Sequence, residues 1–473
     1  MHITNNNISR RNFVKTASIA TGAIISAPII NSCMAEGKND KEITINQVNS
    51  NFEREPLVRP FGFKGGYMSE IWQTISLLES DAGNQGLGLD TQSVLWSDAQ
   101  VFATNSEAAG NALMYAITER AMQMVNGMKF TTPIDLQEAI LDDVYAYAQK
   151  ATSNSDLRMT FALNALVGLD NAAWMLYARE NGYSNFDQLI PKAYQPALSH
   201  KHDKVASIPL MAYNIPIDEI TQAVDEGYFF MKIKIGQPGT QNEMLEKDKD
   251  RLSAIHTAIG DKRTKYTKDG KLPYYFDANG RYEKKETLLK LLDHAKSIGA
   301  YDQIAVIEEP FPEHAEIDVH DIEISLAADE SAHTDKDALK RIEMGYKAIA
   351  LKAIAKTMSM TMKIAQIAYE HDVPCFCADL TVNPILVEWN KVVASRLAAF
   401  PGLGGMGLME TNGHQNYKNW DAMRSFHPYP NAEWSKTNDG VFNLDKDYYA
   451  KSGGILEASE HYMKLVLPPF AKS

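Results

Sequence analysis

Met231-Lys232-Ile233-Lys234-Ile235-Gly236 reads as a short buried strand that carries a lysine at every second position. Because side chains alternate between the two faces of a strand, Lys232 and Lys234 point to the same side. Two neighbouring ammonium groups repel each other, and a hydrophobic core does not favour them. The pair therefore indicates that an anion lies in front of it, or that one lysine needs a depressed pKa to act as a base.

Four further apolar runs end in a charged residue at intervals of about one strand and one helix. These residues are Asp277, Glu308, Asp329 and Lys352, with steps of 31 residues (277 to 308), 21 (308 to 329) and 23 (329 to 352). In a (β/α) barrel the strand ends meet on one face, so these ends and the lysine pair would share one pocket. Three carboxylates among three ammonium groups predict a metal site with bases around it.

The chain around these motifs alternates short apolar runs with helical patterns. The expected strands are 208–213, 229–235, 274–277, 305–308, 325–329, 348–352, 374–379 and 407–410. Eight such strands predict a closed parallel barrel. Upstream, strand patterns over 42–51, 71–78 and 90–96 and helical patterns over 106–125, 132–150 and 159–180 predict an α+β domain. Downstream, we expect an aromatic tail that packs back on this domain and ends in a strand over 463–467.

Composition excludes some classes of partner. The chain has 473 residues, of which 45% are hydrophobic, and a formal net charge of −13. The length is enough for a large core and more than one domain. The negative charge argues against nucleic acid or an anionic membrane surface as a partner. A small-molecule carboxylate as the substrate is implied only by the family resemblance described below.

The first 40 residues form a predicted targeting segment. Ser9-Arg10-Arg11-Asn12-Phe13-Val14-Lys15 is a twin-arginine pattern, and the apolar run that follows, 17–30, is too short to span a membrane. Ile30-Asn31-Ser32-Cys33 resembles a lipoprotein cleavage box with Cys33 as the lipidated residue. We therefore expect export by the twin-arginine route to the periplasm, as a soluble or a lipid-anchored protein.

Two other features carry less specific signals. Cys375 and Cys377 lie two apart on one expected strand, where a disulfide would be strained, so we expect two small buried side chains. The stretch 59–67 is glycine-rich, aromatic and basic. It is either a surface turn or a flexible lid that brings Arg59 or Lys64 over a bound anion.

Taken in order, KIKIG, DANG, IEEPF and ADES resemble the enolase superfamily, in its mandelate racemase/muconate lactonizing branch. The stretch 164–189 resembles the last helix of that family's cap, and Asp439-Gly440 followed by Gly453-Gly454 resembles its closing segment. The resemblance implies an α/β fold, a modified TIM barrel of (β/α)7β type. It assigns 41–190 to an N-terminal α+β capping domain, 200–425 to the barrel, and 426–473 to a C-terminal segment that completes the cap. It also implies a homo-oligomer.

The resemblance assigns roles to the charged strand ends. Asp277, Glu308 and Asp329 correspond to ligands of Mg²⁺, a hard cation that prefers carboxylates, with Glu309 as the rival of Glu308. Lys234 corresponds to one general acid/base and Lys352 to the base on the opposite face of the substrate. Lys232 would hold the substrate carboxylate and depress the pKa of its neighbour. Lys356, one turn beyond Lys352, is the rival for that role and is expected in the loop.

The family's reaction is removal of a proton α to a carboxylate, with the resulting enediolate stabilised by the cation and a lysine. Bases on both faces favour a racemase or epimerase of an amino-acid-derived or hydroxylated carboxylate, and the same set serves a cycloisomerase. A sugar-acid dehydratase is the runner-up, and a catalytically dead exported binding protein is a distant alternative. The seventh strand, 374–379, has no histidine, which disfavours a mandelate-type mechanism.

The eighth strand bears on specificity. Dipeptide epimerases commonly carry D-x-D there to hold the substrate ammonium, and this chain has Glu410-Thr411-Asn412 instead. Glu410 would hold an ammonium or a hydroxyl; a helix cap or a surface acid is the alternative. His414 and His333 are expected to be loop histidines.

Overall fold

The structure is a computed structural model that describes residues 40–63 and 66–467. The twin-arginine pattern, Cys33 and Lys64 lie outside the described residues, so the predictions made for them stay predictions. Among the described residues, no helix is both long and apolar enough to cross a membrane.

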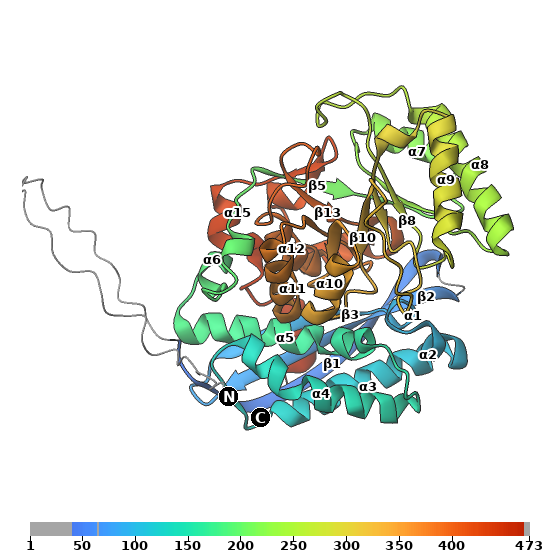
Figure 1. Cartoon of the computed structure of the whole chain (residues 1–473). Helices are drawn as coiled ribbons and strands as arrows, with labels where there is room; N and C mark the ends of the chain where they lie inside the picture. The colour runs from blue at the N-terminus through green and yellow to red at the C-terminus, as the bar shows by residue number, and fades with distance from the viewer. Residues whose placement is uncertain (1–39, 64–65, 468–473) are drawn as a thin grey trace, which may run out of the picture. The chain divides into compact units, whose positions relative to one another are not determined.

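The N-terminal part is an antiparallel sheet covered by helices (Figure 1). Its strands are β1 (Ile43–Phe63), β2 (Gly66–Ser80), β3 (Gln85–Gln92) and β4 (Lys129–Phe130), in the order β3-β2-β1-β4. Its helices are α1 (Val94–Ser97), α2 (Ala99–Thr104), α3 (Glu107–Val125), α4 (Pro133–Thr152), α5 (Met159–Asn181) and α6 (Phe186–Leu189). The α+β domain expected from the sequence is therefore present.

Helix α5 is buried along almost its whole length because strand β3 approaches it closely. A Cβ atom on Gly88 would lie 1.9 Å from the carbonyl oxygen of Gly168, and one on Gly86 would lie 2.0 Å from that of Ala172. Only glycine permits this distance between a strand and a helix.

The strand expected over 90–96 was wrong in its second half, because β3 ends at Gln92 and helix α1 begins at Val94. Asn164 of α5 explains the end of the strand. Its side-chain oxygen accepts hydrogen bonds from the backbone N–H of Ser93 and from the hydroxyl of Ser97, both at 3.0 Å. These bonds satisfy groups that a sheet ladder would otherwise have to pair.

The second part is the parallel barrel. Its strands are β5 (Lys204–Ile208), β6 (Leu210–Met211), β7 (Lys232–Lys234), β8 (Tyr274–Asp277), β9 (Ile304–Glu308), β10 (Ser325–Ala328), β11 (Ala348–Leu351), β12 (Cys375–Cys377) and β13 (Gly407–Glu410). Strand β5 pairs with β13, and β6 pairs with β7, all in parallel. Since β5 and β6 are one stretch interrupted only at Pro209, the ring of strands closes on itself, as the sequence predicts.

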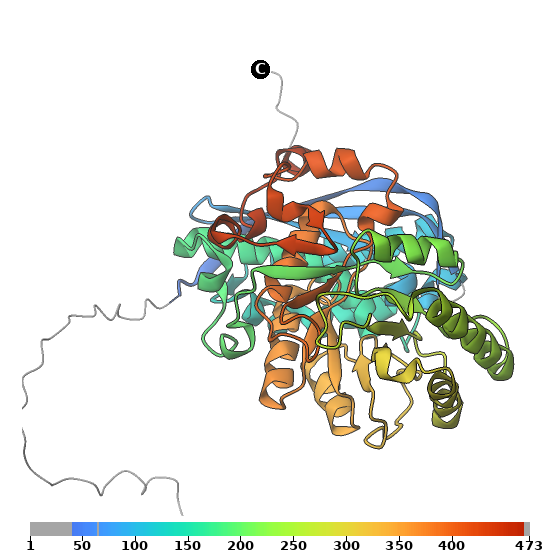
Figure 2. The same ribbon diagram turned by 90° about the horizontal axis from the view of Figure 1, so that it is seen from above.

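Helices α7 (Ile217–Asp225), α8 (Gln241–Ile259), α9 (Lys285–Ser297), α10 (Asp335–Glu343), α11 (Met358–Glu370) and α12 (Pro384–Ala394) connect the strands. Figure 2 shows the yellow-green pair α8 and α9 outside the sheet. The connection from β9 to β10, residues 309–324, contains no helix and runs as a loop. This loop brings Glu313 to the N-terminal domain.

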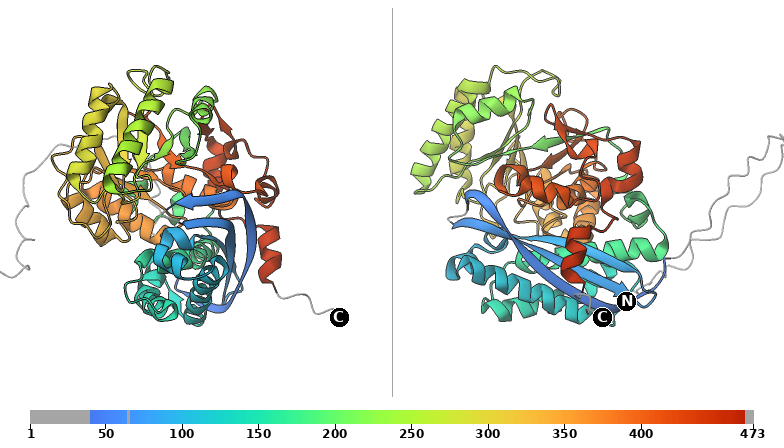
Figure 3. Two further views of the ribbon diagram at one scale, coloured as in Figure 1. Left: turned by 90° about the vertical axis from the view of Figure 1, so that its right-hand side faces the viewer. Right: turned by 180° about the vertical axis from the view of Figure 1, so that it is seen from behind.

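The C-terminal segment contains α13 (Gly413–Asn416), α14 (Trp420–Ser425), β14 (Thr437–Asn438), β15 (Val441–Asn443), α15 (Lys446–Lys451) and α16 (Glu460–Val466). Strand β15 pairs antiparallel with β5 of the barrel. Helix α16 packs on β1 and β2 (Figure 3), so the expected return of the tail to the first domain is confirmed. The side chains of Asn49 and Asn51 donate to the backbone carbonyls of Val466 and Leu465.

The strand expected over 463–467 was wrong, because this stretch belongs to helix α16. Tyr462 and Val466, four residues apart, are both buried at 1% exposure. Residues four apart lie on one face of a helix. A strand that buried the same two side chains would also bury the residue midway between them. Short apolar runs do not distinguish the two patterns.

Candidate active site

The charged residues singled out in the sequence converge at the carboxyl ends of the barrel strands. Asp277, Glu308 and Glu410 are the last residues of β8, β9 and β13, while Asp329 and Lys352 directly follow β10 and β11. The register places Lys234 opposite Asp277 and Asp277 opposite Glu308. These four acids and Lys232 and Lys352 beside them are between 0 and 3% exposed. A parallel barrel therefore assembles this cluster from six strands.

Lys232 lies at the centre of the cluster. Its Nζ is 2.8 Å from Glu308 Oε1, 3.0 Å from Asp277 Oδ2 and 3.2 Å from Glu410 Oε2. Burial acts to lower the pKa of Lys232, but the charges of Asp277, Glu308 and Glu410 raise it well above its ordinary value. Lys232 is therefore a fixed cation that organises three carboxylates.

Lys234 extends toward the open side of the same strand. Its Nζ is 2.5 Å from Asp277 Oδ2 and 2.7 Å from Asn279 Oδ1. Asn279 adopts a positive φ of 45°, which turns the chain so that its own backbone N–H donates to Asp277 Oδ1 at 2.9 Å. Its side-chain amide donates to Glu330 at 3.0 Å. Burial raises the pKa of Asp277, but Lys232 and Lys234 together bring it below its ordinary value.

Lys352 lies on the other side of the cluster. Its Nζ is 2.5 Å from Asp329 Oδ2 and 4.4 Å from the centre of the Trp96 ring. Burial lowers the pKa of Lys352, whereas the neighbouring Asp329 raises it, and the net direction is upward. The depressed pKa expected for one lysine of the pair is not found for Lys232, because it is paired with carboxylates.

Lys356 and Glu309, the rivals of Lys352 and Glu308, have structural roles. Lys356 Nζ donates to the backbone carbonyls of Asp329 (2.6 Å) and Ala332 (3.0 Å), so it holds the loop after β10. Glu309 Oε2 accepts from the backbone N–H of Asp329 at 2.8 Å and from the Ser331 hydroxyl at 3.0 Å. Both rivals bind that loop from behind, whereas Lys352 faces the cavity.

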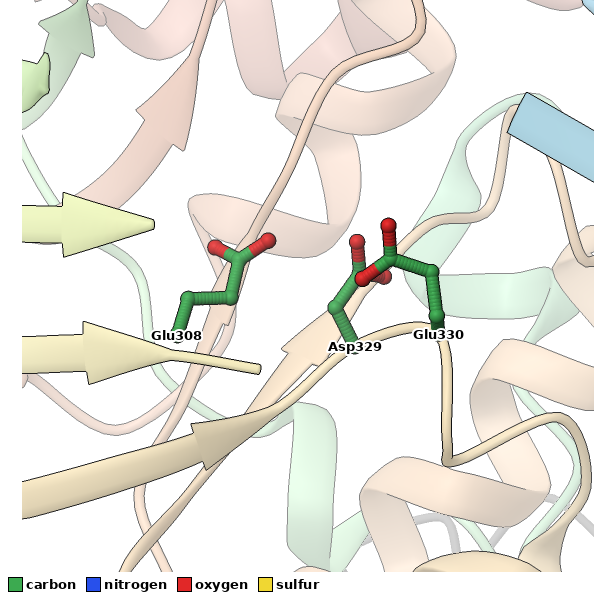
Figure 4. Close-up of side chains that lie close together, drawn as sticks. All are labelled: Glu308, Asp329 and Glu330. Carbon is green, nitrogen blue, oxygen red and sulfur yellow. The ribbon is translucent and has the colours of Figure 1, made fainter. Parts of the chain in front are cut away.

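A group of carboxylates in the cluster fits a hard divalent cation. Glu308, Asp329 and Glu330 each offer an oxygen, and these atoms lie within 4.8 Å of one another; Figure 4 shows Glu330 beside Asp329 with Glu308 across from them. Asp329 Oδ1 is buried without a hydrogen bond from any described residue, and it forms an ion pair with Lys356 Nζ at 3.4 Å. An all-oxygen set of this kind suits Mg²⁺.

The metal prediction and the geometry differ at one residue. Asp277 is held by Lys232 and Lys234 and is not in the group within 4.8 Å, whereas Glu330 is. Sequence reasoning missed Glu330, although it directly follows Asp329 in the ADES motif. Burial raises the pKa of Asp329, but Lys352 and Lys356 lower it to about 2, so this carboxylate is ionised at neutral pH.

Glu410 is a buried anchor for Lys232 and neither a helix cap nor a surface acid. Its Oε2 accepts from the backbone N–H of Asp379 at 2.9 Å in addition to Lys232, and its Oε1 accepts from the Asn412 side chain at 3.1 Å. Asp379 in turn accepts from the backbone N–H groups of Leu380 (2.7 Å) and Asn412 (2.7 Å). Burial first, and then the charge of Glu410, raise the pKa of Asp379 to about 7.

Two adjacent cavities open at this end of the barrel. The first is lined by the charged cluster and by Phe61, Met68 and Trp96 of the N-terminal domain. The second has a volume of about 240 Å³, shares Phe61 and Leu210 with the first, and is lined by Arg59. The stretch 59–67 contains the turn of the β1–β2 hairpin; of its described residues, Phe61 lines both cavities, while Arg59 and Tyr67 line the second.

Other predicted residues lie elsewhere. His414 lines a separate cavity near α12, and His333 Nε2 is 3.6 Å from Glu313, so neither joins the cluster. Cys375 and Cys377 are free and buried, as expected. Trp96, like Glu330, was missed: it comes from a four-residue helix of the other domain, and nothing in its local sequence distinguishes it from a core residue.

Residues 217–407 match the family model described as "Enolase C-terminal domain-like". The resemblance drawn from the motifs is thereby confirmed for the barrel. A sequence search of proteins with curated functions finds no match.

Solved structures share the fold over most of the chain at low identity. A dipeptide epimerase from Enterococcus faecalis, complexed with Mg and L-Leu-L-Tyr, has a TM-score of 0.56 at 16% identity, covering 79% of this chain and 92% of its own. N-succinyl Arg/Lys racemase from Bacillus cereus has 0.56 at 15%, covering 79% and 89%. An enolase-superfamily member from Listeria innocua has 0.61 at 16%, covering 90% and 98%.

Proposed function

We propose that the protein is a Mg²⁺-dependent racemase or epimerase that removes and returns the proton α to a carboxylate. The observation that carries the proposal is the placement of the two lysines. β7 and β11 lie four steps apart in a ring of eight strands, so Lys234 and Lys352 face each other across the barrel mouth. The racemases and epimerases among the similar structures add support at the level of the fold.

The chain's own residues suit this reaction. Lys232, a fixed cation, would bind one oxygen of the substrate carboxylate and keep the negative charge that develops there close to the barrel floor. Asp329, Glu308 and either Asp277 or Glu330 would hold Mg²⁺, which when bound supplies further positive charge to that carboxylate and acidifies the α-proton. Phe61, Met68 and Trp96 exclude water above.

Proton transfer is assigned to the facing pair. For one enantiomer the neutral amine of Lys352 would take the α-proton while the ammonium of Lys234 donates a proton to the opposite face, and the roles reverse for the other. Burial lowers the pKa of Lys352 less than Asp329 raises it, so this neutral form is the minor one at neutral pH. Each lysine has a carboxylate at 2.5 Å, Asp277 for Lys234 and Asp329 for Lys352. These partners hold the two Nζ atoms in place between turnovers.

The test is proton NMR in D₂O with Mg²⁺ on pooled N-acylated amino acids, dipeptides and sugar acids. The wild type should lose the α-proton signal with the carbon skeleton intact. Lys234→Ala and Lys352→Ala should each slow the exchange at least about 100-fold, because a general base contributes about that much. Lys340→Ala, an exposed lysine of α10, is the control and should exchange as the wild type does.

Other outcomes redirect the assignment. Exchange that survives in both lysine variants would contradict the two-base proposal. A 2-keto-3-deoxy product would identify the dehydratase, and ring closure without exchange would identify the cycloisomerase. Mg²⁺ binding without any chemistry on any pool would place the substrate outside these three classes of carboxylate.

We also propose export by the twin-arginine route with Cys33 as a lipid anchor, supported by the N-terminal motif. Cell fractionation of Arg10→Lys/Arg11→Lys should show retention inside the cell, and Cys33→Ala should release the exported protein from the membrane fraction. Unchanged distribution of either variant would refute the corresponding step. The proposed homo-oligomer is tested by light scattering on the mature chain.

A further inference from the structure

Trp96 combines two observations that the proposed mechanism does not use. Its ring lies against the Nζ of Lys352, at 4.4 Å from the centroid, and the residue lines the cavity that contains the charged cluster. Its indole Nε1–H is buried and makes no hydrogen bond within residues 40–63 and 66–467, while the side chain as a whole is 4% exposed. An indole N–H can only donate, and a buried donor without an acceptor is costly.

The surrounding structure fixes Trp96 in this position. The backbone carbonyl of Trp96 accepts from Arg158 Nη1 at 2.8 Å, and the guanidinium of Arg158 also binds Glu313 of the barrel at 2.6 and 2.9 Å. Asn164 holds the residues on both sides of the turn, Ser93 and Ser97. The four-residue helix α1 is thus anchored to its own domain and, through Arg158, to the barrel.

The acids at the ends of β12 and β13, next to β11, leave little for a positively charged substrate group. Both oxygens of Glu410 accept hydrogen bonds from Lys232, Asp379 and Asn412, and both oxygens of Asp379 accept from backbone N–H groups. Each carboxylate is therefore already used within the described structure. A substrate ammonium would have to displace a buried lysine or backbone donor from one of them.

We infer that Trp96 is a specificity-determining residue whose indole N–H donates to an uncharged oxygen on the substituent of the reacting carbon, as in the acyl group of an N-acylated amino acid. The inference rests on the proposed function, since Lys352 must reach the α-carbon for Trp96 to lie beside its substituent. Trp96 would thus recognise substrates with an acceptor oxygen on this substituent and reject those with a free ammonium there.

The test uses the full enzyme with ¹⁵N-labelled tryptophan and Mg²⁺. The indole resonance of Trp96 is assigned as the one missing in Trp96→Phe, a variant that keeps an aromatic ring over Lys352. N-acetyl amino acids should shift this resonance downfield, and the same amino acids without the acetyl group should not. In exchange assays Trp96→Phe should lower kcat/KM for the N-acetyl compounds about 10- to 100-fold, the range for an unpaired buried acceptor.

Trp72→Phe is the matched control, because Trp72 is equally buried, its N–H is already bonded to Glu70 at 3.0 Å, and it does not line the cavity. This variant should keep the wild-type preference. If N-acetyl compounds exchange while the Trp96 resonance stays in place and Trp96→Phe matches the wild type, the inference fails and the proposed function stands.

The opposite result distinguishes the role inferred for Trp96 from the proposed racemase function. If N-acetyl compounds shift the Trp96 resonance but no α-proton exchanges, recognition by Trp96 stands and the racemase proposal fails. If free amino acids bind or exchange as well as the acetylated ones, the assigned selectivity is wrong.

Discussion

Asp329 accepts a hydrogen bond from Lys352 with one oxygen and keeps the other buried, without a hydrogen bond among the described residues and 3.4 Å from Lys356 Nζ. Asp329→Asn retains the shape and removes the charge, so Mg²⁺ affinity should fall at least about tenfold, the loss seen even for supporting groups of metal sites. Isothermal titration calorimetry measures this directly. Asp318→Asn, an exposed acid on the β9–β10 loop, should bind Mg²⁺ as the wild type does. Equal affinity in all three proteins would remove Asp329 from the metal site.

The roles of Lys352 and Lys356 can be distinguished by measuring the stability and the activity of variants at each position. Lys356→Met leaves the carbonyls of Asp329 and Ala332 without their buried donor, which should lower the free energy of unfolding by about 1–3 kcal/mol. Urea denaturation measures this loss. Lys352→Met should instead abolish racemisation of a substrate that Mg²⁺-loaded wild type turns over. If Lys356→Met is as stable as the wild type but inactive, the two roles have been assigned the wrong way round.

At the residue scale, sequence patterns were sufficient where a charged residue ends an apolar strand. Asp277, Glu308, Lys352 and Glu410 were found in this way, because parallel strand ends meet on one face. Trp96 and Glu330 could not be found. One comes from a different domain, and the other depends on the side-chain direction in a turn, which no periodicity records.

Helix α10 directly follows the loop that carries Asp329, and a capping box starts it. The Thr334 hydroxyl accepts from the backbone N–H of Asp337 at 3.3 Å, and the Asp337 carboxylate accepts in return from the N–H of Thr334 at 3.1 Å. Thr334→Ala should cost about 0.5–2 kcal/mol of unfolding free energy. Thr240→Ala removes the equivalent cap of α8, away from the metal loop, and should cost a similar amount.

Mg²⁺ affinity distinguishes the two cap variants. Only Thr334→Ala should also weaken Mg²⁺ binding, because its helix supports the ligand loop. Calorimetric titrations that give the same affinity for both variants would show that the cap stabilises the helix without shaping the site.

At the element scale, the sequence patterns predicted most accurately the bounds of strands that lie between turns and end in a charged residue. The ranges 274–277 and 407–410 were predicted as observed, and helix α5 differs by one residue at its end. The failure at 463–467 has a physical cause, since four apolar positions in five residues satisfy a buried strand and a buried helix face equally. Only the surface of β1 and β2, on which this stretch packs, decides between a strand and a helix.

The ion pair between Arg158 and Glu313 joins the two domains and makes stability depend on pH. Burial would raise the pKa of Glu313, but His333, 3.6 Å away, and the charge of Arg158 lower it to about 2. A depressed carboxylate pKa stabilises the folded state above the unfolded value of 4.5, and that contribution disappears as the pH falls toward 2. Its size should be about 1–3 kcal/mol at neutral pH, as for hydrogen bonds to charged groups.

Glu313→Gln should therefore be less stable than the wild type at pH 7, and the difference should shrink between pH 4.5 and the lowest pH at which both proteins stay folded. Urea unfolding at a series of pH values measures the difference. Glu316→Gln, an exposed acid three residues further on, is the control. A pH-independent difference for Glu313→Gln would show that packing, and not charge, explains its effect.

For the whole molecule, the order of motifs was enough to predict a capped barrel, because the alternation of strands and helices allows few topologies. The contacts between the domains were out of reach. Arg158 and Glu313 are 155 residues apart in the chain, and neither belongs to a recognisable motif.

The return of the chain's last elements to its first ones has a consequence for synthesis. Strand β15 covers the edge of β5, and helix α16 covers β1 and β2, with bonds that span 414 and 417 residues. Neither domain can complete its packing until residues 441–466 have left the ribosome. Complete packing therefore waits until synthesis has passed residue 466, and a chain that stops before it leaves an open strand edge in the barrel and a bare sheet face in the cap, both of which favour aggregation.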